Sequence, residues 1–378
     1  MRYNWQQEDW PNFRYNLEDM HEILFSIAKK VGFINGQQSN LPEDLQTEIM
    51  INLMVEEAVK TSAIEGEYIN RLDIRSSIKN KLGVHQNHIK VHDRRADGIA
   101  ELMLKVRNTF KQPLTENVLF DWHLSLLSSS LNPNLLVGRW REDKEPMQVV
   151  SGHHGKWVVH FEAPPSQKVP SEMQRFIHWF NNTAPGKTQA IEFPPIRSAI
   201  AHLYFESIHP FDDGNGRIGR AIAEKALMQG FGFPSLLSLS TTIEAHKKIY
   251  YEALKQASRS NEITAWIQYF VDLVLNAQID TQAQINYIIS KARFFDSFSD
   301  KLNERQMKVI KRMMDTGIKG FEGGMSAKKY MAITGTSKAT ATRDLQDLLA
   351  MHAFKQIGSG RSIRYDLILG GRVLTINK

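Results

Sequence analysis

The chain has 378 residues, which is long enough for two or three domains with buried cores. Its hydrophobic content of 42% and charged content of 23% are typical of a globular protein and exclude wholesale disorder. The absence of cysteine excludes disulfides, thiolate metal sites and cysteine nucleophiles. No apolar run is long enough to span a bilayer, so the sequence indicates a cytoplasmic protein without a membrane partner.

The net charge of +6 is concentrated at one end of the chain. Residues 301–378 contain 15 Lys and Arg against 6 Asp and Glu, whereas the preceding 300 residues contain 32 against 35. Binding of nucleic acid is therefore a hypothesis for this last segment alone.

The first 40 residues are predicted to form an aromatic-rich arm followed by an amphipathic helix. We expect its rings to pack the arm onto the body, although a recognition surface is the alternative. These rings are Tyr3, Trp5, Trp10, Phe13 and Tyr15. A second helix is predicted over residues 42–66, because Pro42 suits a first helical turn and Gly66 is a typical stop.

Helical periodicity continues through most of residues 41–296 and predicts an all-α (α-rich) body. The expected helices cover residues 71–110, 114–129, 171–181, 196–207, 216–230, 244–259 and 262–295. One segment differs, because residues 147–162 contain two β-branched and aromatic runs around a glycine-containing turn. This pattern predicts a β-hairpin.

Residues 297–378 are predicted to form a winged helix-turn-helix, with helices over 303–315 and 326–334 and within 335–353, and a hairpin over 354–368. In such a module, exposed polar and basic side chains on the last helix and the wing would contact DNA bases and phosphates. The candidates are Lys338, Thr340, Thr342, Arg343, Lys355, Arg361 and Arg364. Asp344 and Asp347 on the same helix oppose DNA binding, and docking of a target or a second copy is the alternative role.

The stretch from His209 to Arg220, HPFDDGNGRIGR, carries the most chemical information. It joins two apolar helices, so its backbone amides open the second helix and form an anion cradle, with glycines that permit close approach. Arg217 and Arg220 are three residues apart and can address one anion. Asp213 is a hard oxygen ligand for a phosphate-bound Mg²⁺, and His209 can accept a proton. Together these residues predict phosphoryl or nucleotidyl transfer.

This stretch resembles the Fic (Fido) family signature, HPFx[D/E]GN[G/K]RxxR, and matches it at every specified position. The resemblance implies a helical core that binds ATP with Mg²⁺ (or Mn²⁺) and transfers AMP to a hydroxyl of a target protein, releasing pyrophosphate. It implies that His209 is the general base, that Asp213 holds the metal and that Phe211 anchors the loop. The implied ATP-binding residues are Gly214, Asn215, Gly216, Arg217, Ile218, Gly219, Arg220, Tyr250 and Tyr251, with core packing as the alternative for the two tyrosines.

The segment TSAIEG, from Thr61 to Gly66, resembles the family's inhibitory motif [S/T]xxxE[G/N]. Thr61 and Glu65 are four residues apart and share a helix face. The resemblance implies that Glu65 pairs with Arg220 and obstructs the γ-phosphate of ATP. In some relatives this glutamate also supports removal of AMP.

The predicted hairpin resembles the family's flap, which pairs with a segment of the target protein by β-addition. The implied docking residues are Met147, Val149, Trp157 and Val159. The resemblance also suggests self-modification and a homodimer. Separately, His85, His88 and His92 would share a helical stripe beside Asp93, which is a weak zinc-site pattern.

Two alternatives to AMP transfer remain open from the sequence. The chain could be a DNA-binding regulator whose Fic-like core senses nucleotide. It could also be an enzyme with another donor, since some relatives transfer phosphocholine or phosphate; the intact glycines and arginines of the signature favour a triphosphate.

Overall fold

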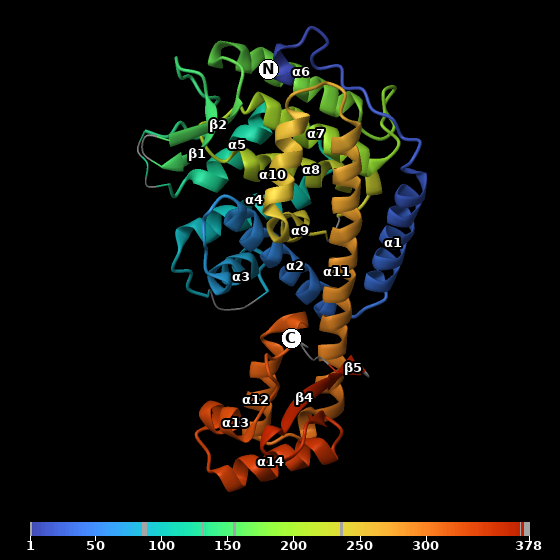
Figure 1. The fold of residues 1–378 in the computed structure, drawn as a ribbon, viewed down its shortest axis with the longest axis vertical. Coiled ribbons are helices and arrows are strands. Elements are labelled where there is room, and N and C mark those ends of the chain that lie inside the picture. The colour runs from blue at the N-terminus through green and yellow to red at the C-terminus, as the bar shows by residue number, and fades with distance from the viewer. Residues whose placement is uncertain are drawn as a thin grey trace. The chain divides into compact units, whose positions relative to one another are not determined.

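The computed structural model describes residues 2–84, 89–130, 132, 134–153, 156–234, 237–370, 372 and 373. The chain divides into two compact units, Met1–Thr281 and Gln282–Lys378 (Figure 1). The second unit begins inside helix α11 (Thr264–Phe298), earlier than the boundary at residue 297 that the sequence suggested. The reason is that the end of this helix carries Phe294, which is part of the hydrophobic core of the second unit.

The N-terminal unit is helical except for one hairpin, which confirms the predicted all-α class. Its helices are α1 (His21–Ser39), α2 (Glu43–Ile64), α3 (Arg71–Lys81), α4 (Arg94–Asn108), α5 (Glu116–Leu127), α6 (Val169–Asn182), α7 (Pro194–Ile208), α8 (Asn215–Phe231), α9 (Leu239–Ala245), α10 (Lys247–Ala257) and the start of α11. Short 3₁₀ turns lie at Asn4–Gln6 (η1) and Ser166–Lys168 (η2).

Two predicted helices are each divided in the structure. The helix expected over 71–110 is wrong as one element, because Gly83 has a φ of +65° and Asp93 caps a new helix by accepting the amide of Arg95. The helix expected over 244–259 starts at Leu239 instead and is interrupted at His246.

Helices α7 and α8 occupy the centre of the N-terminal unit (Figure 1). From Pro195 to Ile208 every residue of α7 is buried, and α8 is buried along most of its length. A helix that is buried on all sides belongs to a core, and α7 contributes apolar residues to two cores at once. Tyr204 and Phe205 pack with α4, α5 and α6, whereas Ile200 and Leu203 pack with α1 and α11. The loop between α7 and α8 is therefore joined at both ends to buried helices.

The hairpin consists of β1 (Gln148–His153) and β2 (Lys156–Glu162), paired antiparallel from Gln148–Glu162 to His153–Lys156. A β-bulge lies between Val149 and Val150. Val149 and Val159 are partly exposed, at 37% and 42%.

The C-terminal unit contains α12 (Glu304–Met314), α13 (Ala327–Thr334), α14 (Lys338–Ala350) and a sheet of β3 (Phe354–Ile357), β4 (Arg364–Leu369) and β5 (Arg372–Val373). Further 3₁₀ turns are η3 (Ser299–Lys301), η4 (Gly317–Lys319) and η5 (Gly360–Ser362). The order of three helices and a hairpin agrees with the order predicted for residues 303–368.

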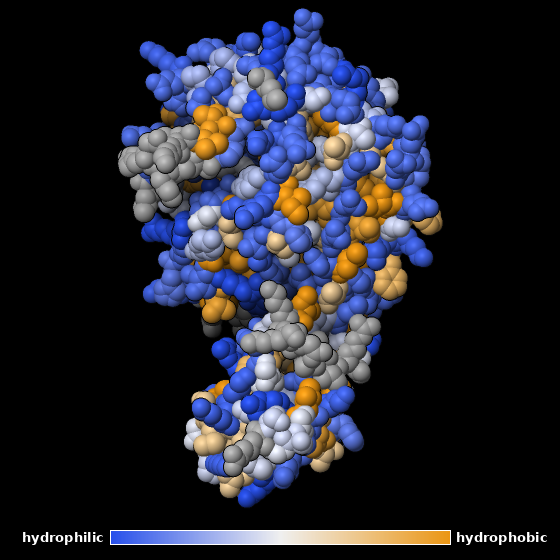
Figure 2. Space-filling model, viewed as in Figure 1, coloured by the Kyte–Doolittle hydropathy of each residue, from blue (hydrophilic) through white to orange (hydrophobic). Residues whose placement is uncertain are grey.

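The surface shown in Figure 2 is mostly hydrophilic, with small, separate hydrophobic patches. Within the described part of the chain, none of the helices combines the length and apolar character needed to cross a membrane.

The contact between α4 and α5 depends on Gly98, and a substitution there tests this packing. A Cβ on Gly98 would lie 2.5 Å from the backbone oxygen of Ser125, and a backbone atom cannot move aside cheaply. We expect Gly98→Ala to destabilise the protein by about 1–3 kcal/mol in urea denaturation. Gly32→Ala is the control, because this residue of α1 has no neighbour within 4 Å, and it should stabilise by about 0.5–1 kcal/mol. Equal effects of the two substitutions would contradict the assigned packing.

Candidate active site

A cavity of about 620 Å³ in the N-terminal unit brings the predicted site residues together. Its wall includes the signature loop, the end of α2, the flap hairpin and α10. The predicted residues that line it are Glu65, Val149, His209, Asp213, Gly214, Asn215, Gly216, Arg220, Tyr250 and Tyr251. Arg217, Ile218 and Gly219, also predicted to bind ATP, are not part of this wall.

The signature loop begins at a residue with an unusual backbone conformation and ends at the first turn of α8. His209 ends α7 with a left-handed backbone (φ +50°), which is uncommon for a residue other than glycine. Gly214 precedes α8 with φ +80°, so the first amides of α8 open toward the cavity. The free amides and the helix dipole at such an end favour a bound anion.

Asn215 holds this loop closed with its side chain. Its Oδ1 accepts the amide of Phe211 at 2.9 Å, and its Nδ2 donates to the carbonyl oxygen of Phe211 at 2.7 Å. The side chain is 3% exposed, so Asn215 can contribute only its backbone to a ligand. Its side chain has a structural role that the sequence did not predict.

His123 on α5 packs against the signature loop and donates a hydrogen bond to it. Its ring stacks on Phe211 with centroids 4.0 Å apart, and Phe211 is fully buried, as expected for an anchor. Nδ1 accepts the amide of Gly138 at 2.9 Å, so Nε2 carries the proton and donates to the carbonyl oxygen of Asp213 at 3.0 Å. Burial lowers the pKa of His123 and keeps this tautomer neutral.

Arg141 fixes the entrance of the loop. Its Nε donates to the carbonyl oxygen of His209 at 2.8 Å, and its amide donates to Pro210 at 3.0 Å. Its guanidinium also donates to the carbonyl oxygen of Pro164, directly after the flap. Arg141 is 1% exposed, so one buried guanidinium is hydrogen-bonded both to the signature loop and to the base of the flap.

Glu206 lies one helical turn before His209, and its carboxylate lies close to the imidazole ring. Oε2 of Glu206 is 3.6 Å from Nδ1 of His209. Burial alone would raise the pKa of Glu206, but His209, His202 and Arg220 together lower it, so the group is a buried carboxylate. A carboxylate at this position favours the proton on Nδ1 and leaves Nε2 of His209 as the basic nitrogen. Gly219 makes room for it, because a Cβ at that position would overlap Oε1 of Glu206.

The two predicted tyrosines of α10 differ. Tyr250 is 1% exposed and its hydroxyl lies 2.8 Å from Nε2 of His202, so core packing accounts for most of its surface. Tyr251 is 39% exposed and borders the cavity, with the ammonium of Lys247 5.7 Å from its ring centre. Only Tyr251 presents an accessible ring for stacking.

Arg220 is buried and takes its partners from the end of α2. Nε donates to Oγ1 of Thr61 at 2.8 Å, and Nη2 contacts the carbonyl oxygen of Thr61 at 3.0 Å and Oε1 of Glu65 at 2.8 Å. Burial alone would lower the pKa of Arg220, but the Glu65 carboxylate raises it above its ordinary value. A Cβ at Gly216 would overlap Oε1 of Glu65, so this carboxylate rests on the first turn of α8.

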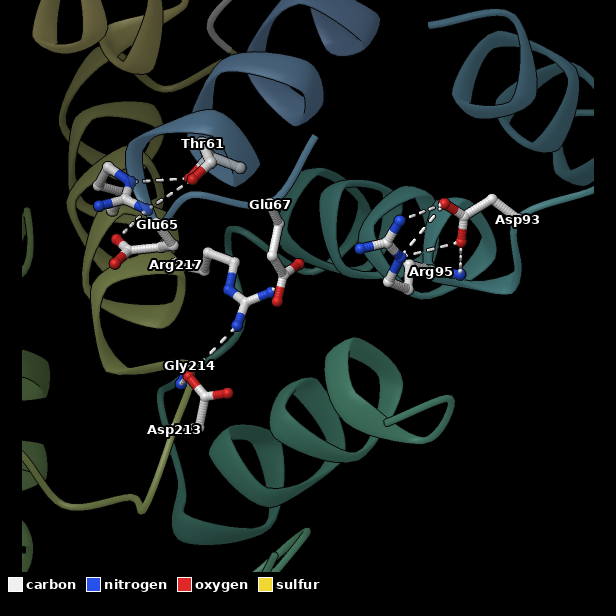
Figure 3. Close-up of polar contacts among 9 residues, drawn as sticks. Thr61, Glu65, Glu67, Asp93, Arg95, Asp213, Gly214 and Arg217 are labelled. Carbon is white, nitrogen blue, oxygen red and sulfur yellow. Dashed lines mark hydrogen bonds and ion pairs between the residues drawn. The ribbon is translucent and has the colours of Figure 1, made fainter. Parts of the chain in front are cut away.

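Arg217 also contacts a carboxylate of this segment. Figure 3 shows it between Glu67 and Asp213, and Nη1 lies 2.7 Å from Oε2 of Glu67. The contact to Oδ1 of Asp213 is longer, at 3.4 Å. Two carboxylates two residues apart, Glu65 and Glu67, therefore neutralise both arginines of the signature.

Asp213 fits a metal that arrives with a phosphate ligand. Its side chain is 54% exposed, and one oxygen accepts the amide of Gly214. Among the described residues, no group of three or more His, Asp or Glu side chains is arranged to hold a metal. A single carboxylate suits Mg²⁺, which usually keeps waters and shares its ligands with substrate phosphates.

The weak zinc pattern finds no support in this region. His85 and His88 lie outside the described residues, and His92 is in a connection rather than on a helix. The carboxylate of Asp93 is bound by Arg95 at 2.7 Å (Figure 3).

Sequence reasoning missed four residues that shape this site: Glu67, His123, Arg141 and Glu206. Glu67 directly follows the inhibitory motif, and Glu206 precedes His209 by one turn, so local spacing could have indicated both. His123 and Arg141 are more than 60 residues from the loop they support. No local pattern predicts such contacts.

Comparison with known protein families gives three matches along the chain. Residues 3–84 match a domain of unknown function (DUF4172), residues 113–227 match the Fic/DOC family, and residues 322–368 match the family described as Transcriptional regulator DIP2311-like, C-terminal domain.

Among curated proteins, the chain is 28% identical over 204 residues to Protein adenylyltransferase Fic of Nematostella vectensis, covering 53% of this chain and 42% of the relative. The protein of the same name from Drosophila grimshawi is 31% identical over 124 residues, covering 31% of this chain and 24% of the relative. The chain thus spans less than half the length of these relatives.

Two solved structures share the fold. A Fic family protein from Desulfovibrio desulfuricans superposes with a TM-score of 0.52 at 20% identity, covering 94% of this chain and 98% of that one. A Fic domain containing signaling protein from Bacteroides thetaiotaomicron gives 0.53 at 17% identity, covering 72% and 97%.

Removal of the Glu206 carboxylate should change the tautomer of His209. In Glu206→Leu, Nδ1 loses the negative charge that lies 3.6 Å away, and we expect the ratio of Nδ1–H to Nε2–H tautomers to fall about tenfold, measured from ¹⁵N shifts of the ring. Glu206→Gln keeps an acceptor oxygen and should preserve most of the ratio. Glu252→Leu removes a carboxylate from the same cavity wall and serves as the control. An unchanged ratio in Glu206→Leu would show that Glu206 does not orient the ring.

Proposed function

Because residues 113–227 make this chain a member of the Fic/DOC family, we propose that it transfers AMP from ATP to a hydroxyl side chain of a target protein and releases pyrophosphate. The observation that carries the proposal is the shared cavity. A basic histidine, the amide-lined start of α8 and a buried arginine all border the same 620 Å³ space.

In this mechanism, His209 acts as general base on the target hydroxyl. As the hydroxyl oxygen bonds to the α-phosphorus, its proton passes to Nε2 of His209, and the bond from the α-phosphorus to the bridging oxygen breaks to release pyrophosphate. The amides of Gly214 and Gly216 bind phosphate oxygens and stabilise the charge that moves to the leaving group. Asp213 would hold Mg²⁺ (or Mn²⁺), which neutralises phosphate charge when bound.

The end of α2 restrains this reaction. In this proposal Arg220 binds the γ-phosphate, and the support for the restraint is that Oε1 of Glu65 lies 2.8 Å from Nη2 of Arg220. ATP must compete for Arg220 with a carboxylate that is negatively charged, as the γ-phosphate is. A nucleotide that binds while this carboxylate stays in place has its α-phosphate displaced from the position that the target hydroxyl attacks. Because Glu65 lines the cavity, we propose that the same carboxylate orients a water for removal of AMP from a modified target.

The flap supplies the docking edge for the target. Val149 and Val159 are exposed, Val149 lines the cavity, and Val159 pairs with Val150, which also lines it. An extended target segment that pairs with this hairpin would bring its hydroxyl toward His209. The side chain of Trp157, a further predicted docking residue, lies outside the described side chains, and Met147 is half-buried at the base.

Substitution of Glu65 tests the enzyme and the restraint together. We expect Glu65→Gly to raise AMP transfer about tenfold or more, because the carboxylate that occupies Arg220 is gone while the amides at the start of α8 remain. The measurement is label from α-³²P-ATP with Mg²⁺ in the protein itself and in added proteins. His209→Ala in the Glu65→Gly background should abolish the label.

The control is Glu56→Ala, because this carboxylate of α2 pairs with Arg71, away from the cavity. It should leave the label unchanged. Absence of label in every variant, despite ATP binding, would contradict AMP transfer and favour another donor, such as one that delivers phosphocholine or phosphate.

We also propose that the C-terminal unit binds DNA through α14. Asp344, which opposed this role in the sequence, is 3% exposed, and its carboxylate pairs with Arg305 at 2.8 Å and accepts the Tyr330 hydroxyl at 2.8 Å. Asp344 therefore faces the core of its unit. The exposed candidate contacts on α14 are Lys338, Thr342 and Arg343, and the wing adds Lys355 and Arg364. Asp347 is also exposed on α14 and still opposes DNA binding.

Thr340 differs from its predicted role as a base contact. It is half-buried, and its hydroxyl lies 3.1 Å from Oγ of Ser337, the residue that caps α14. The side chain of Arg361 lies outside the described side chains.

The salt dependence of DNA binding tests the surface of α14. We expect the double variant Lys338→Ala, Arg343→Ala to weaken binding of a random-sequence duplex and to reduce the slope of log K against log salt by about 2, one per lost phosphate contact. Lys187→Ala, an exposed charge in the N-terminal unit, should change neither quantity. If the double variant binds like the wild type, DNA is not the ligand of α14.

A further inference from the structure

The N-terminal arm lies against the back of the cavity wall. Asn4, in η1, is fully buried, and its side-chain amide and its backbone amide each donate a hydrogen bond to a segment that borders the cavity. Its Nδ2 donates to Oγ of Ser207 at 2.8 Å, and its backbone amide donates to the carbonyl oxygen of Ser258 at 2.8 Å. Ser207 and Ser258 both line the cavity, and Ser207 is two residues before His209.

The same arm holds the base of the flap. Nε1 of Trp5 donates to the carbonyl oxygen of Glu162 at 2.7 Å, at the last residue of β2. The ring of Tyr3 meets the ring of Phe161 edge to face, with centroids 5.0 Å apart. Phe161 lines the cavity, so the arm contacts three cavity-lining residues from three different segments.

The flap depends on such external contacts. A two-stranded hairpin is marginally stable alone in water, and the exposed valines show that its outer part has little packing. Its base is fixed by the Ala163 amide to Met147, by Arg141 through Pro164, and by Trp5. Of these, only Trp5 belongs to the arm.

We propose that residues 3–5 are positioning residues that anchor the flap to α7 and thereby set the distance between the docking edge and His209. This inference gives a role to the start of the domain of unknown function and rests on the proposed function for its effect on target modification. The arm holds the flap base, the end of α7 and the α10–α11 junction in one hydrogen-bonded cluster, so its loss should loosen the flap and leave the anion-binding amides intact.

The test compares two tryptophans of the arm that have the same chemistry. Trp5→Phe keeps an aromatic ring but removes the N–H donor to the flap together with the second ring of the indole. Trp10→Phe removes an equivalent donor, because Nε1 of Trp10 donates to Oε2 of Glu172 at 2.9 Å on α6, and Glu172 does not line the cavity. The two variants therefore make the same chemical change and differ in the element released, and the free energy of unfolding of each is measured beside them.

Hydrogen exchange of the flap amides is the first measurement. We expect exchange over residues 147–162 to become about three- to tenfold faster in Trp5→Phe, the change expected for one lost hydrogen bond, and to stay unchanged in Trp10→Phe. Equal exchange in both variants would overturn the anchoring role. This result does not depend on any catalytic activity.

Self-labelling with α-³²P-ATP in the Glu65→Gly background is the second measurement. Trp5→Phe should lower the labelling rate severalfold and leave the dissociation constant of ATP unchanged, whereas Trp10→Phe should alter neither. A parallel loss of ATP affinity would overturn the inference, because it would show that Trp5→Phe disturbs the phosphate-binding amides at the start of α8 and not the flap alone. If Glu65→Gly gives no label at all, the proposed function fails, and the hydrogen-exchange comparison still decides the anchoring role.

Discussion

The burial of Arg220 is the constraint on which the site depends. A guanidinium that is 3% exposed loses most of its hydration, and the loss must be offset by hydrogen bonds and an opposite charge. Nothing on α8 itself provides them, so Thr61 and Glu65 of α2 do. The packing of α2 on α8 and the pairing of the Arg220 guanidinium thus depend on the same contacts. Any ligand that takes Arg220 from Glu65 must bring a charge of the same sign and leave the arginine equally well paired.

The rigidity of the signature loop has a similar origin. Asn215, His123 and Arg141 each satisfy backbone groups of the loop from a different direction, and each is buried. Unpaired buried polar groups cost about 1–3 kcal/mol each, so the loop has few alternative conformations of similar free energy. Pre-organised donors need little rearrangement when charge develops, which is the property that nucleotidyl transfer requires.

The sequence predicted what depends on short-range patterns. Helical spacing located the helices, and the signature located the loop because its residues are contiguous. The division of residues 71–110 followed from a positive φ at Gly83, which periodicity does not reveal. The sequence does not reveal that Asp344 faces the core of its unit, because its partners, Arg305 and Tyr330, come from other helices. His123, Arg141 and Asn4 act across more than 60 residues of chain, where only packing determines which groups meet.

The absence of a side chain at Gly216 has an evolutionary consequence. The signature of this family allows lysine as well as glycine at that position, but here the Glu65 carboxylate occupies the space that a Cβ would need. A lysine at 216 therefore demands that residue 65 be shortened or moved. Across homologues, the two positions should covary, with glycine at 216 wherever a glutamate is kept at 65, so the identity of one residue in the loop records whether the contact between residue 65 and the first turn of α8 has been retained.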